Sequence, residues 1–511
     1  MRSLWRSSTP GRSTARRSTT SECSPVSGID EQEIQAIIER VRGRLEAAGD
    51  SGAGLAARTE LDDIKDVEFG DGIFRTIDEA VAAATRAFQE YQRIGLGGRY
   101  AVVDAIRASM LQEAERLANM AHQETGLGRP DDKLVKNRLV ATKAPGPEDL
   151  EPTAVTGDAG MMVTEWAPFG VIGAITPTTN PTSTIINNTI AVVSAGNACV
   201  FNVHPNARKV SAENIRLLNR AIVGAGGPPN LITAIPTPTI ASAQELMRHP
   251  DVRVLLVTGG PAVVREALKT DKRAIAAGPG NPPAVVDETA DVQNAARSIV
   301  AGASFDNNLI CTDEKTTIVV ESVADRLVQE MGRNGAYVLK EHELRKLERV
   351  IFKELGPPNK PGVINPQWIG QNASVILAEI GVQVDSEETR LVVAEVPNEH
   401  SLVWTEQMMP VMPVTRVQTI DRAIDLAVKS EHGFRHTASI HSTNVERITR
   451  MAVAMNCSIF VANGSNFSGL GEGGEGFTSF SIASPSGDGL TRPRTFSRER
   501  RVTVVGALRI V

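Results

Sequence analysis

The stretch LLVTGGPAVVREAL, residues 255–268, decides the fold class of this chain. It holds an apolar, strand-like run, then the pair Gly259-Gly260, then a helical pattern that Pro261 opens. Proline at the first helical position costs no hydrogen bond, and a helix N-terminus beside two glycines suits a phosphate group. The stretch therefore predicts a strand–turn–helix unit of an α/β domain, with a candidate phosphate-binding turn at its centre.

The same alternation of short apolar runs and helical patterns continues on both sides of this stretch. The strand-like runs are GVIGAIT (170–176), ACVFNV (198–203), LITAIP (231–236), NPPAVVDE (281–288), KTTIVVE (315–321), TRLVVAEV (389–396) and CSIFVAN (457–463). Such alternation predicts parallel sheets covered by helices. The C-terminal segment 497–511 instead alternates Val502, Val504, Leu508 and Ile510 on one face, which is typical of a terminal strand that pairs with another subunit.

The composition excludes several classes of protein. The 511 residues carry a net charge of −6, which gives no sign of a nucleic acid or an anionic membrane as a partner. No apolar run approaches the ~18 residues needed to span a bilayer. The cysteines are no disulfide framework and none is paired at metal-ligand spacing, so we expect no metal and a reducing, cytosolic setting. There are four of them: Cys23, Cys199, Cys311 and Cys457.

The N-terminal segment differs from the rest of the chain. Residues 1–28 are rich in Arg, Ser and Thr; we expect a disordered tail or translation of an unused upstream start, although an organellar transit peptide has a similar composition. Residues 29–48 predict an amphipathic helix, and 49–59 a flexible linker. The apolar stripe of that helix is Ile34, Ile37, Ile38, Val41 and Leu45. We expect a tethered docking helix, with a first domain helix as the alternative.

One glycine motif matches a dinucleotide-binding fingerprint in its letters but not in its structural context. The run from Gly469 to Gly474 matches G-x-G-x-x-G, but residues 475–489 after it predict no helix that could receive a pyrophosphate. We therefore expect a flexible loop there and no dinucleotide fingerprint.

Cys311 stands in FDNNLICTDEK, residues 305–315, between polar, loop-like residues and a strand-like run. A free cysteine is usually a small buried hydrophobe, and this is how we interpret Cys199 and Cys457 within their apolar runs. The alternative for Cys311 is a nucleophile that meets a substrate.

Four segments in a fixed order resemble the aldehyde dehydrogenase superfamily. They are PFGVIGAITPTTNP (168–181), VTGG (257–260), AAGPGNPPAVV (276–286) and the Cys311 segment. The likeness runs from about residue 60 to the end of the chain, and as an ordered set it is specific. It implies two Rossmann-like α/β domains, one for the cofactor and one for catalysis, and a small β oligomerisation arm.

Carried over residue by residue, the resemblance implies a site. Cys311 matches the nucleophile, and Asn180 matches the amide that holds the oxyanion together with the nucleophile's backbone N–H. Glu406 matches the acid that grips the nicotinamide ribose. The remaining matches concern binding of NAD: Thr178, the turn Thr258, Gly259 and Gly260, and either Asn202 or His204 at the adenosine ribose.

The departure from the family pattern is informative. Hydrolytic members carry a glutamate thirty-odd residues before the cysteine, whereas Ala277 stands at that position here and no acid lies between Lys272 and Asp287. A general base activates water against a thioester. Without that base, the acyl group should pass to a better nucleophile, and the thiol of coenzyme A is the expected one.

Residues 469–501, with GPGNPP and FDNN, are similar to the CoA-acylating branch that works in bacterial microcompartments. The resemblance implies oxidation of propionaldehyde to propionyl-CoA with NAD+ in the microcompartment lumen. It also implies docking of residues 29–48 on shell proteins. The alternatives are an acetaldehyde-specific acylating enzyme, a hydrolytic aldehyde dehydrogenase, and a catalytically idle scaffold protein.

The expected domains follow from the same resemblance. We expect an NAD-binding domain over 60–148 and 165–279, and a catalytic domain over 280–487. Oligomerisation strands are expected over 149–164 and 488–511, so that the protein forms a homodimer or a homotetramer.

Overall fold

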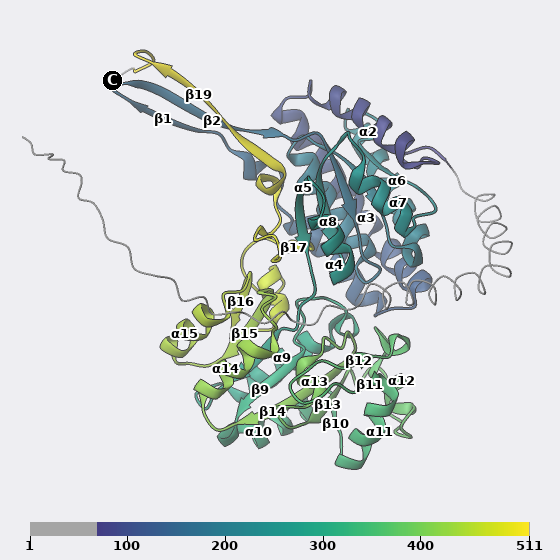
Figure 1. Ribbon diagram of the computed structural model, residues 1–511, viewed down its shortest axis with the longest axis vertical. Coiled ribbons are helices and arrows are strands. Elements are labelled where there is room, and N and C mark those ends of the chain that lie inside the picture. Colours follow the sequence, from purple (N-terminus) through teal and green to yellow (C-terminus); the bar gives the residue numbers. More distant parts are fainter. Residues whose placement is uncertain (1–68, 510–511) are drawn as a thin grey trace, which may run out of the picture. The chain divides into compact units, whose positions relative to one another are not determined.

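The computed structural model describes residues 69–509. The expected tail, docking helix and linker (1–28, 29–48 and 49–59) lie outside the described residues, as does Ile510. From Phe69 onward the fold is built on two parallel sheets, and a third, antiparallel sheet forms an arm (Figure 1). The predicted α/β class is confirmed.

The first sheet has five parallel strands in the order β5-β4-β3-β6-β7. Their bounds are β3 (Val171–Ile175), β4 (Ala198–Asn202), β5 (Ile232–Ala234), β6 (Val252–Thr258) and β7 (Arg273–Ala277). Nearly every residue of the three central strands is buried, which matches their continuous apolar sequence.

Helices cover both faces of this sheet. α5 (Pro181–Ser194) and α6 (Arg208–Gly224) pack on one face, with α3 (Leu96–Thr125) and α4 (Pro130–Lys143) outside them. The opposite face carries α2 (Ile77–Tyr91), α7 (Ile240–Arg248) and α8 (Pro261–Leu268). The helix that follows β3 and the helix that follows β6 therefore leave the sheet on opposite faces.

The second sheet has seven parallel strands in the order β10-β13-β14-β9-β8-β15-β16. They are β8 (Pro283–Val286), β9 (Thr316–Val320), β10 (Ala336–Val338), β13 (Leu391–Glu395), β14 (Val411–Val417), β15 (Thr437–His441) and β16 (Ile459–Ala462). One face packs against α9 (Val292–Ser304) and α10 (Glu321–Arg333), the other against α14 (Ile420–Ser430) and α15 (Val445–Met455). A third cluster gathers α11 (Glu341–Ile351), α12 (Ala373–Ala378), α13 (Ser401–Trp404) and the short pair β11 (Phe352–Glu354) and β12 (Val363–Ile364).

After β16 the chain returns to the first sheet. Phe467, Leu470 and Phe480 belong to the hydrophobic cluster of the first sheet, although the sequence analysis groups them with residues 280–487. Because Asp66–Val511 forms one compact unit, the expected domain boundaries stay a prediction. The glycine motif from Gly469 to Gly474 begins in a short helical turn, η5 (Asn466–Leu470). The next regular element is β17 (Ile482–Ala483), so no helix follows the motif.

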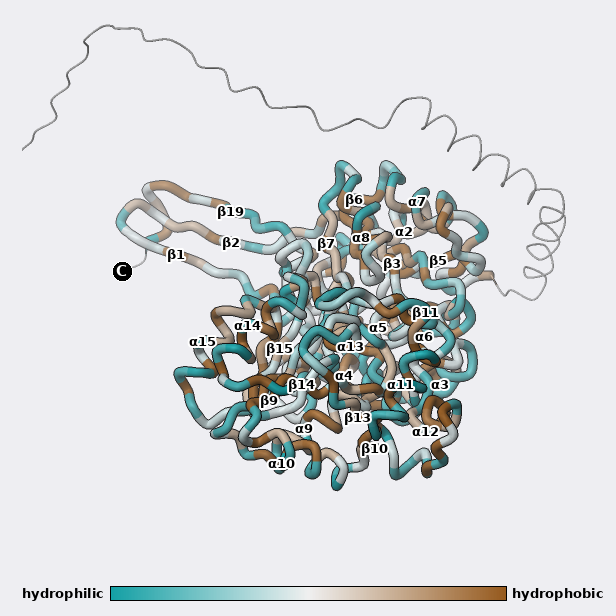
Figure 2. The backbone as a smooth tube through the Cα atoms, turned by 60° about the horizontal axis from the view of Figure 1, so that its bottom comes forward, coloured by the Kyte–Doolittle hydropathy of each residue, from teal (hydrophilic) through white to brown (hydrophobic). Residues whose placement is uncertain are grey.

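The arm consists of β1 (Thr153–Gly157), β2 (Gly160–Pro168) and β19 (Ser497–Val505), paired antiparallel in that order. The predicted C-terminal strand is confirmed for 497–505, and its second half is the more hydrophobic one (Figure 2). The prediction that Leu508 continues this strand is wrong: Gly506 turns the chain at φ +72°, and Leu508 itself has a φ of +63°.

None of the described helices combines the length and the apolarity that crossing a membrane requires. Within residues 69–509 there is also no group of three or more His, Cys, Asp or Glu side chains that could hold a metal ion.

We predict that Asn197→Ala lowers the free energy of unfolding by about 2–4 kcal/mol, because buried polar groups would lose their partners. The Asn197 side chain is fully buried and links three segments. Its Oδ1 accepts the N–H groups of Phe169 (2.7 Å) and Gly170 (3.0 Å), and its Nδ2 donates to the Phe496 carbonyl (2.9 Å). Urea denaturation measures the change. The exposed Gln418→Ala is the control, with an expected change within about 0.5 kcal/mol; equal effects of the two variants would contradict the prediction.

Candidate active site

A cavity of about 650 Å³ lies where β3 and β6 end. Helices leave these two neighbouring strands on opposite faces of the sheet, and such a reversal leaves a crevice at the carboxyl ends of the strands, where α/β proteins bind ligands. All nine site residues expected from the sequence line this cavity. They are Thr178, Asn180, Asn202, His204, Thr258, Gly259, Gly260, Cys311 and Glu406.

Asn180 is placed by the passage from β3 into α5. It is the residue before the helix, and Pro181 occupies the first helical position, where its missing N–H costs nothing. Its side chain is only 8% exposed. Its Nδ2 is 3.3 Å from the Thr179 hydroxyl, a long contact that leaves the amide N–H groups available to a ligand in the cavity.

Cys311 lies in a turn formed by an unusual backbone. Asp306, Asn307 and Asn308 all have positive φ, at 45°, 57° and 64°. Asp and Asn are the non-glycine side chains that tolerate this left-handed conformation best, which explains the sequence FDNN physically. Lys315 closes the turn: its buried Nζ donates to the Asn308 carbonyl (2.8 Å) and to the Ile310 carbonyl (3.0 Å).

The thiol of Cys311 is half-buried and faces the cavity. Burial, and next the charge of Glu406, raise its pKa to about 12, while Lys315 acts in the opposite direction. Among the described residues no backbone carbonyl accepts the N–H of Cys311, so it can donate to an oxygen in the cavity.

The turn after β6, Thr258–Gly260, is the candidate phosphate cradle. The Gly259 N–H donates to the Ala277 carbonyl (3.2 Å), and a Cβ at Gly259 would lie 2.9 Å from the Val263 side chain, which is too close. Thr258 shares a hydrogen bond with Ser481 (2.8 Å). The turn leads into the eight-residue α8, and a helix N-terminus suits a phosphate group.

The structure does not choose between Asn202 and His204, because both line the cavity. The Asn202 Oδ1 accepts from the Ser242 hydroxyl (2.6 Å), whereas the His204 Nδ1 accepts from the Asn206 N–H (3.2 Å). The Thr178 hydroxyl has no partner among the described residues and so is available to a ligand.

Glu406 is the only carboxylate among the described residues that line the cavity. The Gly280 N–H approaches its Oε1 at 3.5 Å, and burial raises its pKa. Ala277 ends β7, is almost fully buried and supplies no acid.

Sequence reasoning missed His436, which lies beside the Cys311 turn. A Cβ at Gly280 would lie 2.7 Å from the Cys311 carbonyl oxygen and 3.1 Å from the His436 ring. Burial, and then Lys315, lower the pKa of His436 to about 3, so the imidazole is neutral. Its Nε2 has no hydrogen-bond partner among the described residues. Neither histidine of FRHTASIH (434–441) carries a sequence signal that would mark it for this position.

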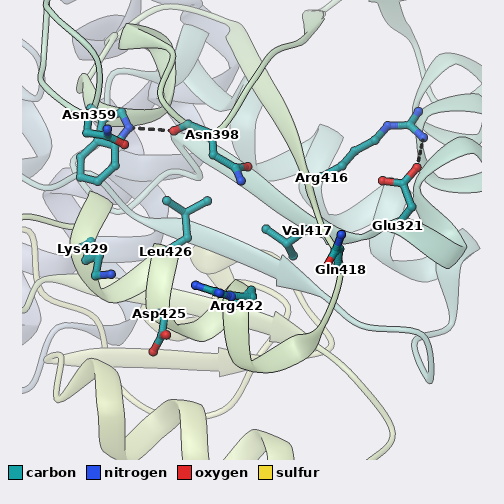
Figure 3. A pocket seen from close by; sticks show the side chains of 11 residues that line it. Glu321, Asn359, Asn398, Arg416, Val417, Gln418, Arg422, Asp425, Leu426 and Lys429 are labelled. Carbon is teal, nitrogen blue, oxygen red and sulfur yellow. Dashed lines mark hydrogen bonds and ion pairs between the residues drawn. The ribbon is translucent and has the colours of Figure 1, made fainter.

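A second hollow, of about 590 Å³, lies at the carboxyl end of β14 (Figure 3). Its walls include Arg416, Arg422 and Lys429, and Arg416 is bound by three carboxylates, those of Glu321, Asp325 and Glu395. It contains none of the nine predicted residues, so the reactive groups belong to the first cavity.

Comparison with known proteins agrees with this architecture. The model of the aldehyde dehydrogenase family matches residues 67–339 and 389–480. An acetylating acetaldehyde dehydrogenase, EutE of Salmonella typhimurium, is 48% identical over 86% of this chain and 94% of its own length.

Two solved structures are also similar. The propionaldehyde dehydrogenase of Rhodopseudomonas palustris, with bound CoA and an acylated cysteine, is 45% identical with a TM-score of 0.83, over 87% of this chain and all of the other. The propionaldehyde dehydrogenase of a Clostridium phytofermentans fucose utilisation microcompartment is 41% identical with a TM-score of 0.83, over 86% of this chain and all of the other.

This chain belongs to the aldehyde dehydrogenase family. The expected likeness to the CoA-acylating branch of that family, which rests in the sequence on the Cys311 segment and on Ala277, is confirmed.

We predict that alkylation of Cys311 by iodoacetamide rises about tenfold per pH unit between pH 7 and pH 10, without a plateau. The thiolate reacts, and a pKa raised to about 12 keeps the free enzyme protonated throughout this window. Glu406→Gln removes a charge that raises this pKa, so the variant should react faster at each pH. Mass spectrometry of the Cys311 peptide measures both rates; a plateau near pH 7 would contradict the prediction.

Proposed function

We propose that this protein is a CoA-acylating aldehyde dehydrogenase, which oxidises propionaldehyde to propionyl-CoA with NAD+ through a thioester on Cys311. The observation that carries the proposal is one cavity that joins Cys311, Asn180 and a phosphate cradle and has no acid at Ala277. Overall, aldehyde, NAD+ and CoA thiol give acyl-CoA, NADH and one proton.

In the first half-reaction the Cys311 thiolate attacks the aldehyde carbon. A carbon–sulfur bond forms and the carbonyl electron pair moves to oxygen. The oxyanion accepts hydrogen bonds from the Asn180 Nδ2 and from the Cys311 backbone N–H; removing one such donor typically costs about 10²–10³ in rate. When bound, NAD+ supplies the hydride acceptor, and Glu406 and the Thr258–Gly260 turn are the groups that would hold it. Return of the electron pair from oxygen expels the hydride and leaves a thioester.

In the second half-reaction the thioester carbon accepts the thiolate of CoA. The bond to Cys311 breaks and restores the cysteine thiolate. The proton of the CoA thiol is the one that the overall reaction releases, because the thiolate is the nucleophile. Water competes poorly here, because Glu406 is the one carboxylate that the described residues contribute to the cavity lining, and it is assigned to the cofactor.

Acetaldehyde is the second candidate substrate. A relative named as an acetaldehyde dehydrogenase is 48% identical and one named as a propionaldehyde dehydrogenase 45% identical, so both substrates are candidates. One methylene changes discrimination by only about 1–3 kcal/mol. A panel of C2 to C4 aldehydes, ranked by kcat/KM with saturating CoA, tests the choice.

We predict that propanal and NAD+ without CoA give a burst of about one NADH per chain and then slow turnover, because the thioester waits for a thiol. Adding CoA should make NADH formation continuous. Cys311→Ala should abolish both phases, since no thioester can form. Stopped-flow measurement of NADH absorbance at about 340 nm records the burst and the continuous phase. Continuous NADH formation that ignores CoA would support the hydrolytic alternative, and full turnover by Cys311→Ala the scaffold alternative.

We also propose that the enzyme works in a microcompartment lumen, with residues 29–48 bound to shell proteins. The apolar stripe of that segment and the microcompartment source of one relative support this. For the arm we propose pairing with further copies, in a homodimer or a homotetramer. Its exposed apolar side chains support this: Val155 (61%), Val502 (65%) and Val505 (81%).

We predict that deletion of residues 1–58 leaves kcat within about twofold of the full chain, because every site residue lies beyond Lys65 in the second compact unit. The deletion should abolish co-purification with microcompartment shells. Activity assays and shell pull-downs, compared with the full chain, measure the two effects. An insoluble deletion variant would instead make this segment part of the folding unit.

A further inference from the structure

Behind the oxyanion site lies a fully buried group of charges on α4. Lys133 and Lys136 are 2% and 1% exposed, and both contact the carboxylate of Asp306, which is 0% exposed. The Lys133 Nζ is 3.0 Å from Asp306 Oδ2, and Lys136 binds the same oxygen. Residues three apart share one face of a helix, so α4 presents both ammonium groups to one acid.

The group carries more positive than negative charge. Asp132 contacts Arg390, and its Oδ2 accepts the Asp306 N–H at 2.8 Å. Three cations against two carboxylates leave one positive charge in excess. A surplus buried charge costs stability. This one lies next to Asn180, where the proposed reaction develops negative charge on the substrate oxygen.

Lys136 also touches the oxyanion amide directly. Its Nζ lies 2.7 Å from the Oδ1 of Asn180. An ammonium group can only donate hydrogen bonds, so the Asn180 atom that faces it must be the carbonyl oxygen. This contact therefore fixes which end of the amide is turned away from Lys136 and remains available to the cavity: the Nδ2 group.

We infer that Lys136 is a positioning residue for catalysis: its buried ammonium holds and polarises the Asn180 amide so that Nδ2 donates to the oxyanion. Two effects act together. The hydrogen bond fixes the orientation of the amide, and the positive charge draws electrons toward Oδ1, which strengthens the Nδ2–H donor. Asp306 connects this lysine to the left-handed turn that carries Cys311, so nucleophile and oxyanion donor share one support.

The inference rests on the proposed function, and a double-mutant cycle tests it. Lys136→Met should lower the rate of the NADH burst by about tenfold to a hundredfold, less than loss of the donor itself, with the KM for NAD+ and CoA changed less than about threefold. In an Asn180→Ala background the same change should have little further effect, because Lys136 acts through Asn180. Lys136→Gln, which keeps a donor but not the charge, should be intermediate.

Lys133→Met is the matched control. It removes the same charge from the same Asp306 but makes no contact with Asn180, so its burst rate should fall by less than about threefold even where it destabilises the protein. Equal losses in Lys133→Met and Lys136→Met would overturn the inference, as would a loss that persists in Asn180→Ala. If Lys136→Met is insoluble, Lys136→Gln undergoes the same cycle. Absence of NADH formation by the unaltered protein would refute the proposed function instead.

Discussion

The site depends on one constraint of parallel sheets, the reversal of the direction in which strands are added. β3 lies between β4 and β6, and the helices after β3 and β6 cover opposite faces. The sheet cannot close over that point, and a cavity of about 650 Å³ remains. The Asn180 amide follows one of these strands and the Thr258–Gly260 turn follows the other. The second sheet and its turn bring the thiol to the same place.

The second requirement is electrostatic. The cavity places a thiol with a raised pKa near the half-buried carboxylate of Glu406, an arrangement that by itself disfavours the reactive thiolate. Two buried lysines supply positive charge. Lys315 binds the Ile310 carbonyl in the Cys311 turn, and Lys136 contacts the Asn180 side chain. In the free enzyme Cys311 is therefore held as a thiol.

Sequence reasoning reached much of this fold because its evidence is local. The apolar runs predicted the strands of both sheets, and ordered motifs selected nine residues that line one cavity. It missed Lys136, Asp306 and His436, because their importance arises only from packing between distant segments: Lys136 and Asp306 are 170 positions apart. Sequence reasoning also extended the last strand past Val505, because an alternating pattern of apolar residues does not reveal the left-handed backbone at Gly506.

The three left-handed residues before the nucleophile also limit how this enzyme can be altered. At positions 306–308 most side chains would strain the backbone, and glycine would relieve the strain but loosen the turn. A library that randomises this segment would therefore consist mostly of inactive variants. The cavity wall is different: positions such as Ile240, whose side chain is 81% exposed, tolerate many shapes. Sequence variation is therefore more accessible in the wall than in the turn, which makes the turn the least evolvable part of the site.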